Sequence, residues 1–76
     1  MNEQTQYQLT IKAHDNLGTL ERILRVIRHR GAHIKSMQMQ TTENNTIIMT
    51  LQLTTERSLF TLQNQVAKLE DVITIE

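Results

Sequence analysis

Apolar residues recur along this chain with two different periods, and the order of these periods limits the folds open to it. In residues 46–54 an apolar side chain stands at every second position and alternates with Ile48, Thr50 and Gln52, a period of two that is typical of a half-buried strand. Residues 19–30 instead repeat their apolar side chains at intervals of three and four, which predicts a helix with one apolar face. The residues of that face are Leu20, Ile23, Leu24 and Ile27.

The same two periods divide the rest of the chain. Residues 7–13 are predicted to form a strand, residues 32–42 a second extended segment, and residues 71–76 a short final strand. Ser58 is expected to cap a second helix, whose apolar side chains again keep helical spacing. These side chains are Leu59, Leu62, Val66 and Leu69.

Turn formers mark the ends of these segments. The first strand ends in "HDNLG", residues 14–18, and "TTENN", residues 41–45, follows the second extended segment. Gly31 supplies the left-handed residue that commonly closes a helix. The alternation is irregular around Ile34 and Lys35, which indicates a bulge in that strand.

The order strand, helix, strand, strand, helix, strand predicts an α+β domain of the ferredoxin-like βαββαβ type. In that fold, two helices cover one face of a four-stranded antiparallel sheet. Right-handed crossovers place the first and third strands in the centre and the second and fourth strands at the edges. Residues 1–76 are expected to form this single domain, because no linker or low-complexity segment interrupts them.

The small size of the chain favours an oligomer. A domain of 76 residues buries only about 60% of the surface that its unfolded chain exposes, and without cysteine no disulfide can brace it. The second strand is an edge strand with apolar Met37 and Met39 on one face, and Lys35 on the same side by sequence parity. We therefore predict a homodimer in which two such strands pair around a two-fold axis.

The charge balance argues against two classes of partner. Lysine plus arginine and aspartate plus glutamate each total eight, so no overall attraction to nucleic acid or to an anionic membrane is expected. No stretch approaches the roughly 18 apolar residues of a membrane span. Residues 1–8 are polar and do not resemble a signal peptide, so a cytoplasmic protein is expected.

The sequence offers no catalytic or metal-binding constellation. Ser36 and Ser58 have no histidine at motif spacing, and the carboxylates are scattered over turns and helix faces. His29 and His33 are four residues apart, but Gly31 between them breaks the helical geometry that would bring them together. We expect neither independent catalysis nor a bound metal.

Four arginines give the predicted first helix a basic polar side. They are Arg22, Arg25, Arg28 and Arg30. Recognition of RNA on this fold usually stacks bases on aromatic residues of the sheet, and residues 46–54 contain none. Two interpretations stay open on this evidence, a solvated helix face and a docking surface for an acidic protein.

The turn "HDNLG" before the first helix is a candidate ligand site. A chain that enters a helix presents free backbone N–H groups, and the helix dipole adds partial positive charge, so a carboxylate can be received there. Gly18 would let a ligand approach the backbone closely. A plain strand-to-helix turn, in which Gly18 serves only geometry, explains the same residues.

Residues 15–37, "DNLGTLERILRVIRHRGAHIKSM", resemble the ACT domain, a βαββαβ module that senses small molecules, usually amino acids, and regulates metabolic enzymes. The matching residues are Gly18, Leu20, Arg30, Gly31, Ile34 and Ser36. The run of residues 25–31 is more specific, and with it the chain resembles the small regulatory subunits of acetolactate synthase of the isozyme II type. The similarity spans residues 7–75, nearly the whole chain.

The resemblance implies a non-catalytic subunit that binds and activates a large catalytic subunit. That partner would use thiamine diphosphate, magnesium and FAD, whereas this chain would bind no cofactor itself. Its products would lead to valine, leucine and isoleucine. We expect the first helix and its end to contribute to docking. The docking residues would be Arg22, Arg25, Arg28, His29 and Arg30.

The resemblance also implies an effector site between paired ACT domains. It would be formed by the turn of one chain and the second strand of its neighbour. Those residues are Asp15, Asn16, Leu17, Gly18 and Thr19, with His33, Ile34 and Ser36 across the interface. Because valine-responsive relatives tend to have asparagine where Asp15 and His33 stand here, we expect valine feedback to be weak or absent. The alternative function is a stand-alone amino-acid sensor that regulates another enzyme.

Overall fold

The computed structural model describes residues 6–76 and contains the six predicted elements in the predicted order. They are β1 (Gln6–His14), α1 (Thr19–His29), β2 (Ala32–Thr41), β3 (Thr46–Thr55), α2 (Leu59–Ala67) and β4 (Val72–Ile75). The polar segment of residues 1–8, which does not resemble a signal peptide, lies partly outside the described residues, since residues 1–5 are not among them.

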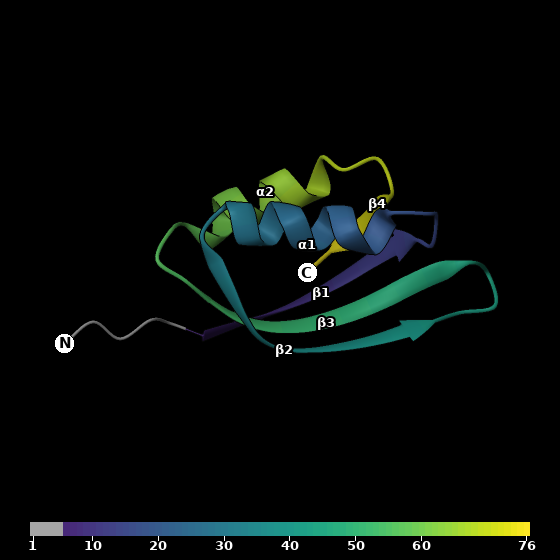
Figure 1. The fold of residues 1–76 in the computed structure, drawn as a ribbon, viewed down its shortest axis with the longest axis horizontal. Helices are drawn as coiled ribbons and strands as arrows, with labels where there is room; N and C mark the ends of the chain where they lie inside the picture. Colours follow the sequence, from purple (N-terminus) through teal and green to yellow (C-terminus); the bar gives the residue numbers. More distant parts are fainter. Residues whose placement is uncertain (1–5) are drawn as a thin grey trace.

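The strands form one antiparallel sheet in the order β2-β3-β1-β4, and both helices cover the same face of it (Figure 1). The predicted ferredoxin-like α+β fold is therefore confirmed, with the first and third strands in the centre. This order leaves β2 and β4 as the two edges of the sheet.

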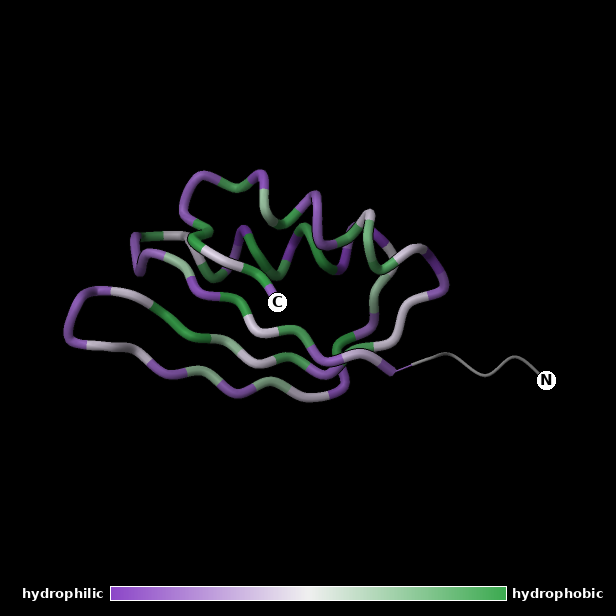
Figure 2. Tube along the Cα trace, turned by 180° about the vertical axis from the view of Figure 1, so that it is seen from behind, coloured by the Kyte–Doolittle hydropathy of each residue, from purple (hydrophilic) through white to green (hydrophobic). Residues whose placement is uncertain are grey.

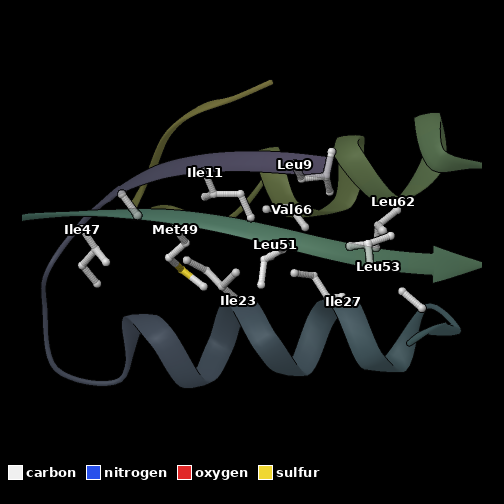
Figure 3. Close-up of a cluster of buried hydrophobic side chains, with 12 residues drawn as sticks. Leu9, Ile11, Ile23, Ile27, Ile47, Met49, Leu51, Leu53, Leu62 and Val66 are labelled. Carbon is white, nitrogen blue, oxygen red and sulfur yellow. The ribbon is translucent and has the colours of Figure 1, made fainter. Parts of the chain in front are cut away.

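The hydrophobic core lies between the central strands and the two helices. Leu9 is paired with Leu51, and Ile11 with Met49, so their side chains share the helix-facing side of the sheet. Figure 3 shows these residues pointing toward the apolar faces of α1 and α2. The buried apolar residues are Leu9, Ile11, Ala13, Ile23, Ile27, Ala32, Ile47, Met49, Leu51, Leu53, Leu62 and Val66. Figure 2 shows apolar segments, in green, along the strands of the sheet and in the helices that lie over it.

Both ends of α1 depend on glycine. Gly18 precedes the helix with φ of +83°, and Gly31 follows it with φ of +88°, a region that residues with a Cβ rarely adopt. No side chain caps the start of α1, whereas the Ser58 hydroxyl at the start of α2 accepts the Thr61 N–H at 3.3 Å. The predicted closing role of Gly31 and the predicted cap at Ser58 are both confirmed.

The irregularity predicted in β2 is also confirmed. Ile34 pairs with Leu53 and Ser36 pairs with Gln52. Two steps along β2 thus correspond to one step along the antiparallel β3. Lys35 therefore has no partner residue on β3, which is the arrangement of a β-bulge.

The bulge decides which residues of β2 face the helices. Because of it, Ile34 shares the helix-facing side with Met37 and Met39, which lie opposite Leu51 and Met49. An unbroken strand would have placed Ile34 on the other face. The helices do not cover the second half of β2, since Met37 and Met39 remain 40% and 42% exposed.

Candidate functional site

The turn between β1 and α1 is closed by a carboxylate from another part of the chain. Asp71, in the loop between α2 and β4, accepts hydrogen bonds from the Asn16 side-chain amide at 2.9 Å and the Thr19 hydroxyl at 2.9 Å. Its Oδ2 also pairs with the Arg22 guanidinium at 2.8 Å. The backbone adds a further link, because the His14 N–H donates to the Asp71 carbonyl at 2.8 Å. The β1–α1 turn is thus tied to the loop before the last strand.

The space beside Gly18 is taken by Arg22. A Cβ at Gly18 would lie 3.0 Å from Nη1 of Arg22, and the same side chain donates to the Leu17 carbonyl at 3.4 Å. The close approach that Gly18 permits is therefore made by the guanidinium of this chain. The backbone of the turn is also largely occupied, since the N–H groups of Asp15 and Thr19 donate to the carbonyls of Asn45 and Asn16.

Alanine at Gly18 is expected to be more disruptive than alanine at Gly31. Both changes incur the penalty of about 1–2 kcal/mol for a left-handed residue with a Cβ. At Gly31 the new Cβ meets Arg57 at 3.5 Å, an ordinary contact, whereas at Gly18 it lies 3.0 Å from the paired Arg22 guanidinium, which must shift by a few tenths of an ångström. Urea denaturation of G18A and G31A tests this order. Equal losses in the free energy of unfolding would show that the contact with Arg22 does not add to the destabilisation of G18A.

The pKa of Asp71 is lowered below the usual value of 3.8, first by the hydrogen bond from Arg22 and then by those from Asn16 and Thr19. A carboxyl group whose folded pKa lies below its unfolded pKa stabilises the fold above the unfolded value. That stability is lost as the pH falls through the folded pKa.

The stability difference between the wild-type chain and D71N is therefore expected to shrink below about pH 4. Above that pH the wild-type chain has the full gain from the ionised carboxylate, and once the pH has fallen through the lowered folded pKa of Asp71 both side chains are neutral. Thermal melting of both proteins between pH 2.5 and 7 measures the difference. A difference that stays constant over this range would contradict the assignment.

The two halves of the predicted effector site lie apart within one chain. The turn residues Asp15–Thr19 precede α1, and His33, Ile34 and Ser36 follow it on β2. The 11 residues of α1, about 16 Å of helix, separate the two groups. A site that combines them needs a second chain, as the prediction assumed, so the effector site stays a prediction.

A surface depression of about 540 Å³ lies where α1 meets the exposed edge of β2. Its lining residues are Leu24, Arg28, Ala32, His33, Ile34 and Met37. Two of the predicted effector residues, His33 and Ile34, contribute to it, whereas the turn residues and Ser36 do not.

The five predicted docking residues differ in their surroundings. Arg22 pairs with Asp71, and Arg30 donates to the Gln65 side chain of α2 at 3.1 Å, so both connect elements of the fold. Arg25, Arg28 and His29 are exposed and line a second depression of about 600 Å³ along α1. Within residues 6–76 the Arg22–Asp71 contact is the only ion pair. The cations available to a partner on α1 are therefore Arg25 and Arg28, with His29 beside them.

Sequence reasoning missed Asp71. It lies in the loop "LED" before the last strand, 49 residues from Arg22 and 55 from Asn16. No spacing or motif connects it to the turn. A second unexpected feature is Leu17, whose side chain is 99% exposed at the tip of the same turn.

Within residues 6–76, no helix combines the length and the apolar character needed to cross a membrane. Among the same residues, no three histidine, cysteine, aspartate or glutamate side chains gather in a metal-binding arrangement.

Comparison with known proteins extends these observations. The ACT domain model matches residues 15–75. The acetolactate synthase isozyme 2 small subunit of Escherichia coli K12 is 43% identical over 68 residues, which cover 88% of this chain and 78% of the relative. The corresponding subunit of Shigella flexneri matches with the same identity and coverage.

Solved structures agree with the fold. The ACT domain from GTP pyrophosphokinase of Chlorobium tepidum superimposes with a TM-score of 0.83 over 97% of both chains, at 20% identity. A formyltetrahydrofolate deformylase from Pseudomonas putida reaches 0.81 over 95% of this chain and 28% of the larger protein, at 10% identity. These distant structures support the fold, while the sequence matches establish the family. The chain belongs to the ACT domain family and, within it, to the family of acetolactate synthase isozyme 2 small subunits.

Proposed function

We propose that this chain is the non-catalytic regulatory subunit that binds and activates the large catalytic subunit of an acetolactate synthase. The observation that carries the proposal is the 43% identity to isozyme 2 small subunits over 88% of the chain. The large subunit would use thiamine diphosphate, magnesium and FAD and would act in the biosynthesis of valine, leucine and isoleucine. This chain would contribute no cofactor, and the complex would work in the cytoplasm.

Reconstitution with the cognate large subunit tests the proposal. We expect the chain to form a complex and to increase the rate of acetolactate formation from pyruvate at a fixed concentration of the large subunit. Size-exclusion chromatography detects the complex, and a colorimetric acetoin assay measures the rate. If no complex forms and the rate does not change, the chain is not the activating subunit.

The active form would be a homodimer joined through β2. This strand is an edge of the sheet, and its unpaired backbone can form hydrogen bonds with a second copy. Met37 and Met39 also expose about two fifths of their side chains next to that edge. Antiparallel pairing of two β2 strands would join two sheets into one and cover both methionines.

Replacing Met39 by lysine is expected to weaken the dimer at least tenfold, about 1.4 kcal/mol. The partner strand would cover this face of β2, so the substitution would bury a charge in the interface without a counter-ion. Replacing Ile73 on the opposite edge strand β4 is a matched control, since Ile73 is also 42% exposed. Sedimentation equilibrium of M39K and I73K measures the dissociation constant of each variant's dimer. Equal weakening by both would exclude β2 as the dimer edge.

Feedback by valine would be weak or absent in this subunit. Asp15 would repel a ligand carboxylate at the turn, and the donors beside it are already engaged by Asp71. Calorimetric titration of valine into the chain, alone and in complex with the large subunit, tests this. Tight binding to the isolated chain would instead favour a stand-alone amino-acid sensor.

A further inference from the structure

Three side chains of the β1–α1 turn and the first turn of α1 converge on one carboxylate. The Asn16 amide donates to Oδ1 of Asp71, while the Thr19 hydroxyl and the Arg22 guanidinium donate to Oδ2. All three distances lie between 2.8 and 2.9 Å. One cationic and two neutral donors around both oxygens make a binding site suited to any carboxylate.

We propose that Asn16, Thr19 and Arg22 form a carboxylate-binding site and that Asp71 occupies it as an internal ligand, which closes the turn to free small carboxylates. The consequence for regulation rests on the proposed function, in which an amino-acid effector would bind at this turn. The binding site itself is independent of that function.

The surroundings of Asp71 support an internal ligand over a chance surface contact. Its side chain is only 16% exposed and Thr19 is 1% exposed, so this part of the cluster is withdrawn from water, whereas Asn16 and Arg22 are exposed. The His14 N–H holds the Asp71 backbone at 2.8 Å and thereby fixes where the carboxylate lies. Asn45, at the far end of the β2–β3 turn, accepts the Asp15 N–H at 2.8 Å and steadies the other side of the turn.

An internal carboxylate competes strongly with a free one. Even a flexible tether gives an attached group an effective concentration in the millimolar range, and Asp71 is held by the fold. A free carboxylate that bound the three donors would first have to displace it. The displaced Asp71 would then lie next to the incoming anion and repel it. The wild-type turn is therefore expected to remain closed at ordinary concentrations of amino acids.

The test removes the internal ligand and offers a replacement. In D71A, acetate can take the place of the missing carboxylate, as in chemical rescue of other deleted side chains. We expect D71A to melt at a lower temperature than the wild-type chain and acetate to recover part of the loss. Sodium chloride at equal ionic strength controls for screening. E70A is the matched variant, because it removes the neighbouring exposed carboxylate, which has no hydrogen bond to any of residues 6–76.

The proposal requires an acetate-specific rise in the melting temperature of D71A and no comparable rise for the wild-type chain or E70A. NMR of the labelled D71A chain should also show acetate shifting the Asn16 side-chain amide. If D71A is unfolded in sodium chloride, acetate should restore the NMR spectrum of the folded chain. D71S repeats the test with a variant that retains one hydroxyl group in place of the carboxylate. The same response to acetate and chloride in both variants would overturn the proposal.

This experiment uses the chain without the large subunit, so its result is separate from that of reconstitution. A chain that activates the large subunit but shows no acetate rescue would refute the internal ligand alone. A chain that shows rescue but does not activate would refute the proposed function alone.

Discussion

Replacing Leu51 by alanine is expected to lower the free energy of unfolding by about 2–5 kcal/mol. Leu51 is fully buried in the middle of β3, a central strand, between the paired Leu9 of β1 and the edge strand β2. Figure 3 shows its side chain in the space between the sheet and α1. Folded domains are stable by only about 5–15 kcal/mol, and a chain of 76 residues lies at the low end. A large fraction of L51A is therefore expected to be unfolded at 25 °C.

Leu17→Ala is the matched control for this prediction, because it removes the same atoms from a side chain that is 99% exposed. We expect it to change stability by no more than about 0.5 kcal/mol. Urea denaturation followed by circular dichroism, at one fixed protein concentration, compares the two variants. Similar losses for L51A and L17A would contradict the position of the core.

The double charge reversal R25E/R28E is expected to weaken binding to the large subunit about 100-fold, which corresponds to about 2.7 kcal/mol. Both arginines are exposed, line the depression along α1 and have no ion-pair partner within residues 6–76. If α1 docks on an acidic surface of the large subunit, as the basic helix predicts, two new carboxylates would face that surface, and like charges across an interface repel. The homodimer should persist, because β2 is unchanged.

Arg22 is excluded from this test, since its reversal would break the contact with Asp71 and alter the fold of the turn. Lys68→Glu is the control, a reversal of an exposed cation just after α2. Titration of each variant into the large subunit, with activation as readout, gives the apparent affinity. If R25E/R28E activates as well as K68E does, α1 is not the docking surface.

Most of the fold could be predicted from the sequence because each prediction depended on neighbouring residues. The alternation in residues 46–54 placed Ile47, Met49, Leu51 and Leu53 on one face, and all four are buried. Gly31 ended α1 as expected, since only glycine adopts its backbone conformation without strain. Even the bulge at Lys35 was visible as a break in the alternation, although the pairing of Ile34 with Leu53 required the structure.

The candidate site was predicted less completely. The turn at Gly18 was identified, with a ligand site and a plain turn both left open, and the structure shows that Arg22 and Asp71 lie beside it. The basic side of α1 was identified as well, but as one group of cations. Which of them remain available depends on Asp71 and Gln65, and neither residue shares a motif with the arginines.

The sequence by itself determined the order of the elements, the residues of the core and the apolar edge strand, because the period of two and the period of 3.6 are local properties of the chain. The tertiary structure alone decided that the β1–α1 turn is tied to Asp71 and that Arg25 and Arg28, unlike Arg22, have no ion-pair partner within residues 6–76. The reason is physical. A carboxylate 49 residues along the chain meets the Arg22 guanidinium only when the sheet brings the loop before β4 beside the end of β1.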